Sequence, residues 1–255
     1  MDIDQILKKR MIDVIFQPIQ DIEHHQVYGF EALARGPAGK LFSPANLFKA
    51  SQKCGKLDQM ELLCLQRALE ETIHLPAGYP LFVNISPETL LYYHKDVINL
   101  IKSSPVKNVI LELTEKNLKE KLLAEMAKVL HLLRGTGIKI ALDDVGSGSR
   151  GFPNICELPA DFLKIDRCMI QGLTKYKNGS APHYFSALEA MVTMAATLGA
   201  AVIAEGVETQ QQFQLVKKAG VYLIQGYYIA HPKPSQYWAD RENQNREEVT
   251  LCSWV

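Results

Sequence analysis

The sequence has no apolar run long enough to cross a membrane. Its N-terminal stretch MDIDQILKKR lacks the apolar core of a secretory signal peptide, so we expect a cytoplasmic chain without a membrane segment. It also lacks an internal repeat and a Gly- or Pro-rich linker. Its 255 residues are therefore expected to form one domain, with a core over about 14–234 and a polar C-terminal tail over 240–255.

Net charge is also absent, because 28 basic residues balance 28 acidic ones. A balanced chain is not typical of a protein that binds polymeric nucleic acid or a membrane surface, although local basic residues could still bind a small phosphate ligand. The five cysteines show no C-x-x-C spacing. They are expected to be reduced, mostly packed thiols, as in a cytosolic protein.

Strand and helix patterns alternate along most of the chain. Two apolar segments, Val14–Ile22 and Val27–Arg35, flank a short polar turn and predict an antiparallel hairpin. Repeated strand and helix patterns follow, the first helix beginning at Ser43-Pro44 and a later one covering about Asn117–Leu133. This order predicts an α/β fold, and a single TIM-type (β/α) barrel fits both the alternation and the length.

Polar residues stand at or near the ends of the predicted strands. In a TIM-type barrel these ends converge on one mouth, so the side chains would form a ring. One such residue is commonly part of a turn or a helix cap, but that explanation accounts poorly for a nearly complete ring of acids with amides and a lysine. The members are Glu31, Asn84, Glu112, Asp143, Asp144, Lys164, Glu205 and Gln225.

The segment IKIALDDVGSGSRG, Ile138 to Gly151, carries two adjacent carboxylates, Asp143 and Asp144. Its apolar start is typical of a strand buried on both faces, and neighbouring side chains of a strand point to opposite faces. The two acids can therefore act together only where the backbone turns, which Gly146 and Gly148 would allow. Alone the pair would be interpreted as an exposed turn, but within the ring it indicates a divalent metal.

The same segment matches a dinucleotide-binding pattern, G-x-G-x-x-G, at Gly146, Gly148 and Gly151. We reject this interpretation because the two preceding aspartates would repel a pyrophosphate. In addition, Pro153 and Pro159 leave no room for a long helix whose N-terminus could bind the phosphates.

Oxygen ligands without His or Cys favour Mg²⁺ or Mn²⁺ over zinc, and two ions could share Asp143. Such a pair can support phosphodiester hydrolysis, with Lys164 close to the developing negative charge. Ca²⁺ is expected to inhibit, because it holds its ligands at longer distances. A barrel that uses one metal to stabilise an enolate remains a chemical alternative.

The sequence resembles the EAL domain family of cyclic di-GMP phosphodiesterases over about Val14 to Pro234. The motifs that carry the resemblance are FQPI (Phe16 to Ile19), FEALAR (Phe30 to Arg35), VNIS (Val83 to Ser86), LELTE (Leu111 to Glu115), LDDVGSG (Leu142 to Gly148), LKIDR (Leu163 to Arg167), AEGVET (Ala204 to Thr209) and QGYYIAHP (Gln225 to Pro232). The resemblance implies a modified barrel with one antiparallel strand, which agrees with the predicted hairpin. It also implies a bacterial protein and a homodimer.

The resemblance further implies a role for each site residue. The metal ligands would be Glu31, Asn84, Glu112, Asp143 and Asp144, with Asp143 bridging two ions. The catalytic residues would be Lys164, Glu205, Asp144 and Glu31. The substrate-binding residues would be Gln17, Leu33, Arg35 and Gln225. Glu115 would anchor the loop after Asp144, and Glu208 would support the site structurally.

The chain departs from the family pattern after the central strand, where DDVGSGSRGF stands in place of the usual DDFGTGYSSL. Val145 replaces an aromatic residue and Ser147 a threonine. His231 replaces the usual lysine near the end of the last motif. The implied function is hydrolysis of cyclic di-GMP to linear pGpG. The alternatives are a catalytically weak or inactive receptor for the dinucleotide and a protein-interaction domain. We expect no regulatory domain before Val14 in this sequence, so the chain would either act alone or be a fragment of a larger protein, and any regulatory partner is unknown.

Overall fold

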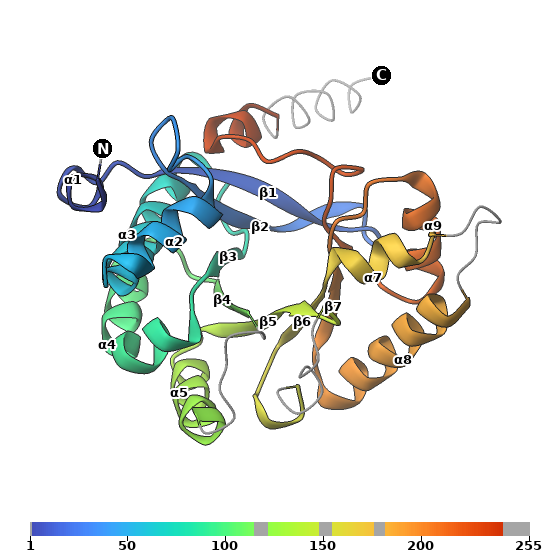
Figure 1. Ribbon diagram of the computed structural model, residues 1–255. Coiled ribbons are helices and arrows are strands. Elements are labelled where there is room, and N and C mark those ends of the chain that lie inside the picture. The colour runs from blue at the N-terminus through green and yellow to red at the C-terminus, as the bar shows by residue number, and fades with distance from the viewer. Residues whose placement is uncertain (1, 115–121, 148–154, 176–181, 242–255) are drawn as a thin grey trace, which may run out of the picture.

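The computed structural model describes residues 2–114, 122–147, 155–175 and 182–241, and its strands close into one barrel (Figure 1). The eight strands follow one another around the barrel in chain order. Their bounds are β1 (Asp13–Asp21), β2 (Gln26–Arg35), β3 (Leu81–Asn84), β4 (Val109–Thr114), β5 (Lys139–Val145), β6 (Phe162–Ile165), β7 (Ala201–Ala204) and β8 (Leu223–Ile224).

Strand β1 runs antiparallel to both of its neighbours, β2 and β8, whereas the other neighbouring strands pair in parallel. The hairpin register places Asp13 opposite Arg35 and Gln17 opposite Glu31. The predicted α/β fold, a modified TIM-type barrel with one antiparallel strand, is therefore confirmed.

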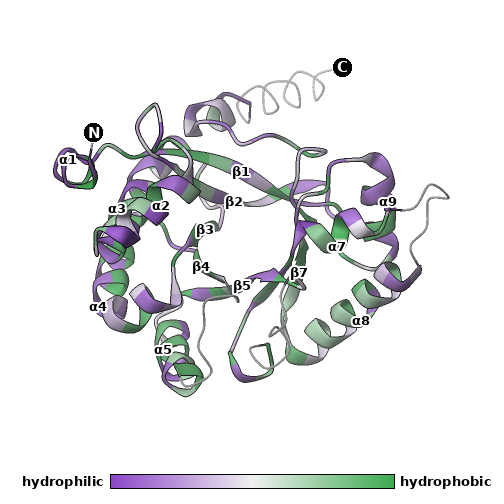
Figure 2. Cartoon of the chain, viewed as in Figure 1, coloured by the Kyte–Doolittle hydropathy of each residue, from purple (hydrophilic) through white to green (hydrophobic). Residues whose placement is uncertain are grey.

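Helices surround the barrel and present both hydrophobic and hydrophilic surfaces (Figure 2). They are α1 (Ile3–Lys9), α2 (Pro44–Lys53), α3 (Leu57–Glu71), the 3₁₀ helix η1 (Thr72–His74), α4 (Pro87–Ser103), α5 (Leu123–Gly135), α7 (Arg167–Gly172), α8 (Pro182–Leu198) and α9 (Gln210–Lys218). The predicted start of α2 is confirmed, since the Ser43 side chain accepts from the backbone N–H of Asn46 and Pro44 follows. Among the described residues, no helix is both long and apolar enough to span a bilayer.

Two helices differ from the sequence-based expectation. Helix α5 begins at Leu123, while most of the predicted first turns after Asn117 lie outside the described residues. Helix α7 was not predicted, because its six residues are too few to show helical periodicity. It begins where the Asp166 side chain accepts a hydrogen bond from the Cys168 backbone N–H at 2.8 Å.

The inside of the barrel is closed by an apolar plug, a cluster with one buried side chain from each of six strands. Its members are Ile19, Phe82, Ile110, Ala141, Phe162 and Ile203, with Tyr28 and Leu223 packed against them. Edge-to-face aromatic contacts join Phe82 to Phe162 at 5.4 Å and Tyr28 to Phe162 at 5.9 Å between ring centroids. Since this plug fills one end of the interior, polar side chains inside the barrel can gather only toward the other end.

Candidate functional site

The polar ring lies one inward-facing position beyond the apolar plug. Side chains two residues apart on a strand share a face, so the residue two positions after each plug residue also points inward. The resulting pairs are Phe82 and Asn84, Ile110 and Glu112, Ala141 and Asp143, Phe162 and Lys164, Ile203 and Glu205, and Leu223 and Gln225. On the antiparallel β1 the order reverses, and Gln17 comes two positions before Ile19.

Lys164 lies at the centre of this ring. Its fully buried ammonium Nζ is 2.5 Å from Glu112 Oε1 and 2.6 Å from Glu205 Oε1. The same atom is 3.7 Å from Glu31 Oε2 and 3.7 Å from Asp143 Oδ1. Carboxylates from β2, β4 and β5 and from the residue after β7 therefore converge on a single cation.

Amide groups connect the rest of the ring. Asn84 Nδ2 donates to Glu31 Oε1 and to Glu112 Oε2, both at 2.9 Å. Gln225 Nε2 donates to Glu31 Oε2 at 2.6 Å and to Gln17 Oε1 at 3.3 Å. Both bonds of Asn84 use its nitrogen, so its Oδ1 acceptor is available to another partner.

Burial and the charges of neighbouring groups shift the pKa values of the ring carboxyl groups in different directions, up for Glu112 and Glu205 and down for Glu31. Burial raises the pKa of Glu205 to about 8, and burial together with the charge of Glu31 raises the pKa of Glu112 well above its usual range. Burial opposes ionisation of Glu31 as well, but the Lys164 ammonium and the Gln225 hydrogen bond lower its pKa overall. Burial would lower the pKa of Lys164, yet the surrounding carboxylates, Asp143 first, raise it.

The donor set fits Mg²⁺ or Mn²⁺. It consists of carboxylate and amide oxygens, which these cations prefer. One buried acceptor, Gln225 Oε1, has no hydrogen bond within the described part of the chain, whereas Glu112 Oε1 already contacts the Lys164 ammonium at 2.5 Å. As the described side chains stand around Lys164, no three or more of the Asp, Glu, His and Cys residues among them are placed so that they could hold a metal ion together. The ring therefore has the right ligand types, arranged around an ammonium.

The two adjacent aspartates lie at a backbone turn, as the sequence indicates. The turn begins at Asp144 itself, whose φ of 61° is in the left-handed region, and continues through Gly146 with φ of 91°. The Asp144 backbone N–H donates to Asp143 Oδ1 at 2.8 Å. Val145, which follows the two aspartates, is fully buried and pairs with Ile165 of β6.

The predicted phosphate-binding residues lie at the rim of the ring. Gln17 donates from Nε2 to the Ala230 carbonyl at 3.0 Å. Arg35 is half-buried, which lowers the pKa of its guanidinium, although the nearby Tyr227 and Glu31 oppose that shift. Its Nη1 donates to the Ala34 carbonyl at 2.8 Å.

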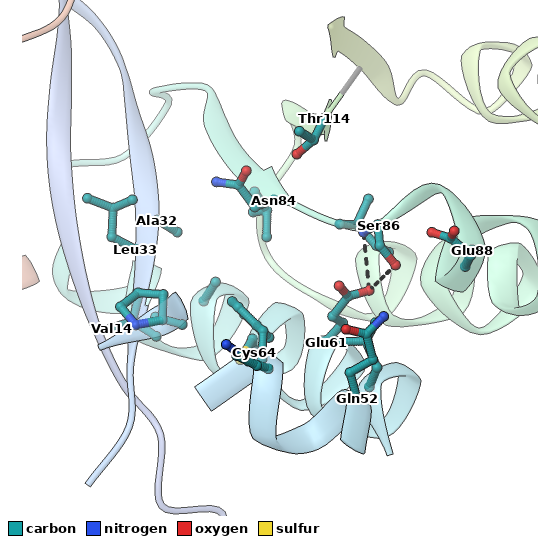
Figure 3. A pocket seen from close by; sticks show the side chains of 18 residues that line it. Val14, Ala32, Leu33, Gln52, Glu61, Cys64, Asn84, Ser86, Glu88 and Thr114 are labelled. Atoms are coloured by element: carbon teal, nitrogen blue, oxygen red, sulfur yellow. Dashed lines mark hydrogen bonds between the residues drawn. The ribbon is translucent and has the colours of Figure 1, made fainter. Parts of the chain in front are cut away.

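A cavity of about 970 Å³ adjoins the ring between β2, β3 and helices α2 and α3 (Figure 3). Leu33 and Asn84 line it on the barrel side, and Gln52, Glu61 and Ser86 line it on the helix side (Figure 3). Its size is within the range of small-molecule sites. Leu33, which is predicted to contact the ligand, therefore lines this cavity.

Some site residues fall outside this description or were missed. Glu115 lies outside the described residues. Glu208 is exposed, and its backbone N–H donates to Gln212 Oε1 at 2.8 Å, so the structure does not bring it into the ring. Glu61 was not predicted, although an acid at helical spacing with Leu57, Cys64 and Ala68 was a signal that could have identified it.

Comparison with known proteins identifies the family. A family model described as EAL domain matches residues 2–232. The chain belongs to the EAL domain family. It is 32% identical over 240 residues to the probable cyclic di-GMP phosphodiesterase PdeN of Escherichia coli, a match covering 89% of this chain and 45% of PdeN. The chain thus spans less than half the length of this curated relative.

Solved EAL structures are similar throughout the barrel. The Pseudomonas aeruginosa MucR phosphodiesterase in complex with c-di-GMP is 26% identical, with a TM-score of 0.78 and coverage of 92% of this chain and 97% of that one. Klebsiella pneumoniae BlrP1 in a calcium and c-di-GMP complex is 26% identical, with a TM-score of 0.77 and coverage of 88% and 56%. BlrP1 also has a structure with manganese and c-di-GMP.

Proposed function

We propose that this EAL domain hydrolyses cyclic di-GMP to linear pGpG with two Mg²⁺ or Mn²⁺ ions. The observation that carries the proposal is the ring of oxygen ligands around Lys164, inside a closed barrel and beyond the apolar plug. Family membership and the c-di-GMP complexes of similar EAL structures support the choice of substrate.

Each ring residue has a proposed role. The ligands of the first metal would be Glu31, Asn84, Glu112 and Asp143, and the second metal would share Asp143 with Asp144. The bound ions would supply a nucleophilic water and stabilise the leaving oxygen at neutral pH. Glu205 and Lys164, 2.6 Å apart, would hold the attacking water and balance the charge that develops on the phosphate.

The substrate would lie across the rim. Gln17 and Arg35 would bind its phosphates, with Gln225 holding Gln17 and Glu31 in place through its two hydrogen bonds. Leu33 would contact the ligand at the edge of the 970 Å³ cavity, which is large enough for one guanine base. We also propose a homodimer, with the segment after Asp166 near its interface; the glycine-rich loop, which is expected there too, lies mostly outside the described residues.

A test uses one protein sample and three metals. We expect c-di-GMP to bind in Ca²⁺ without turnover, because the longer Ca²⁺–oxygen distances would misplace the attacking water. Conversion to pGpG is expected in Mg²⁺ or Mn²⁺. Calorimetry measures binding and chromatography measures product. As a control variant, Glu189→Gln removes an exposed carboxylate on α8 and should behave like the wild type.

Other outcomes would assign another function. Binding with no product in any metal would contradict hydrolysis and favour a c-di-GMP receptor. The first variants to test for restored activity would then be Val145→Phe and Ser147→Thr. No binding in any metal would contradict both and favour a protein-interaction domain.

A further inference from the structure

Glu61 is a buried acid that the proposed chemistry does not use. It is only 9% exposed and lies on the face of α3 that lines the cavity, together with Leu57, Cys64 and Ala68. Burying a carboxylate among such neighbours is unfavourable unless hydrogen bonds compensate. Its hydrogen bonds therefore indicate why this position carries an acid.

Two hydrogen bonds join Glu61 to Ser86, the residue at which α4 is capped, and the Thr89 side chain in the first turn of α4 also interacts with Glu61. Glu61 Oε2 accepts from the Ser86 hydroxyl at 2.7 Å and from the Ser86 backbone N–H at 3.1 Å (Figure 3). Ser86 is the N-cap of α4, and its hydroxyl oxygen accepts from the Thr89 backbone N–H at 3.2 Å. One carboxylate oxygen thus fixes the turn at which β3 ends and α4 begins.

This turn immediately follows Asn84, a proposed metal ligand. Strand β3 ends at Asn84, and the next residue, Ile85, is held on the barrel side by its N–H donating to the Glu112 carbonyl at 3.0 Å. On the helix side, the turn is held by Glu61 through Ser86. The direction in which the Asn84 amide leaves the backbone depends on both anchors.

We propose that Glu61 is a positioning residue for the metal site, which acts through Ser86 to hold Asn84 beside Glu31 and Glu112, where it would serve as a ligand of the first metal. The inference rests on the proposed function, since it requires that metal. Groups that orient a ligand without touching the metal typically change metal affinity about 10–100-fold when they are removed. A cavity-facing acid that served only to contact substrate would leave metal binding without nucleotide unchanged.

The test measures Mn²⁺ binding without nucleotide, by electron paramagnetic resonance of the free ion. Glu61→Leu removes both bonds, and we expect its Mn²⁺ Kd to rise about tenfold. Glu61→Gln keeps an oxygen that can accept both bonds, so its Kd should stay near that of the wild type. Glu71→Gln, the same change at a surface ion pair of α3 with Arg67, is the matched control and should have no effect.

A second pair of variants covers the case in which Glu61→Leu does not fold. Ser86→Ala removes the stronger of the two bonds and should weaken Mn²⁺ binding, whereas Ser86→Thr keeps a hydroxyl and should restore it. Saturating Mn²⁺ should return the kcat of all folded variants toward the wild-type value, since the proposed defect is in ligand orientation.

Two outcomes would overturn this inference about Glu61 and leave the proposed function standing. One is wild-type Mn²⁺ affinity in folded Glu61→Leu or Ser86→Ala protein. The other is an equal loss of affinity in Glu61→Gln and Glu61→Leu, which would mean that the negative charge acts at a distance rather than through Ser86. If the wild type itself bound no Mn²⁺, the metal site of the proposed function would fail, and this inference would fail with it.

Discussion

Removing the Lys164 ammonium should destabilise the metal-free protein and make its stability depend on added metal. In Lys164→Met, the carboxylates of Glu31, Glu112, Asp143 and Glu205 would lose the cation that lies 2.5–3.7 Å from all of them. The methionine side chain has as many heavy atoms as the lysine side chain has without its Nζ. Packing against the plug therefore changes little. The main effect is therefore electrostatic.

The expected size follows from burial. Removing one partner of a buried ion pair costs about 3–5 kcal/mol, because the remaining charge keeps its desolvation cost. In a domain of this length each kcal/mol shifts Tm by about 2–4 °C, so the chelator-treated variant should melt about 6–20 °C below the wild type. The loss should be smaller at low pH, where the carboxyl groups take up protons instead of repelling one another.

The assay is thermal unfolding in EDTA and in excess Mn²⁺. Added Mn²⁺ should raise the Tm of Lys164→Met more than that of the wild type, since the ion supplies the missing positive charge. Lys95→Met, at an exposed position on α4, should change Tm little in either condition. A metal-free Lys164→Met protein with the wild-type Tm would refute the electrostatic reasoning. So would a variant whose lost stability Mn²⁺ does not restore.

Three further predictions follow from the site and the fold. Asp143→Asn should abolish pGpG formation in saturating Mg²⁺ and leave circular dichroism unchanged, because an amide cannot bridge two cations. Burial raises the folded-state pKa of Glu61, so its contribution to stability should fall as pH rises from about 4.5 through that pKa. Urea unfolding should accordingly show a flatter pH profile for Glu61→Gln than for the wild type. Light scattering should give a dimer mass, and a fully active monomer at high concentration would contradict the proposed homodimer.

The ring residues on the parallel strands could be predicted from the sequence because strand periodicity is short and local. An apolar residue followed two positions later by a polar one places both side chains inside the barrel, as at Phe82 and Asn84. The barrel closure then brings distant strand ends together, so that Asn84 and Glu31 form a hydrogen bond. The ring thus follows from local patterns together with one assumption about topology.

The distances within the ring could not be predicted. A sequence indicates that Lys164 points inward, but the 2.6 Å contact with Glu205 depends on the register between β6 and β7. The helical spacing of Glu61 indicates a buried acid, but it does not indicate which residue that acid contacts. Its partner Ser86 belongs to another strand–helix unit, and local periodicity carries no information on which turn a helix residue will reach.

The antiparallel strand explains why strand-end reasoning could not identify Gln17. In the parallel strands the ring residue follows the plug residue, so it stands near a strand's carboxyl end and is visible as an apolar run that ends in a polar side chain. Strand β1 enters the barrel in the opposite direction, and its ring residue precedes its plug residue, Ile19, in mid-strand. Only the family resemblance marked Gln17. In the structure, Gln17 accepts a hydrogen bond from Gln225 at 3.3 Å and donates one to the Ala230 carbonyl. The reversed strand therefore brings the Gln17 side chain to the same end of the barrel as Glu31, the residue with which Gln17 pairs.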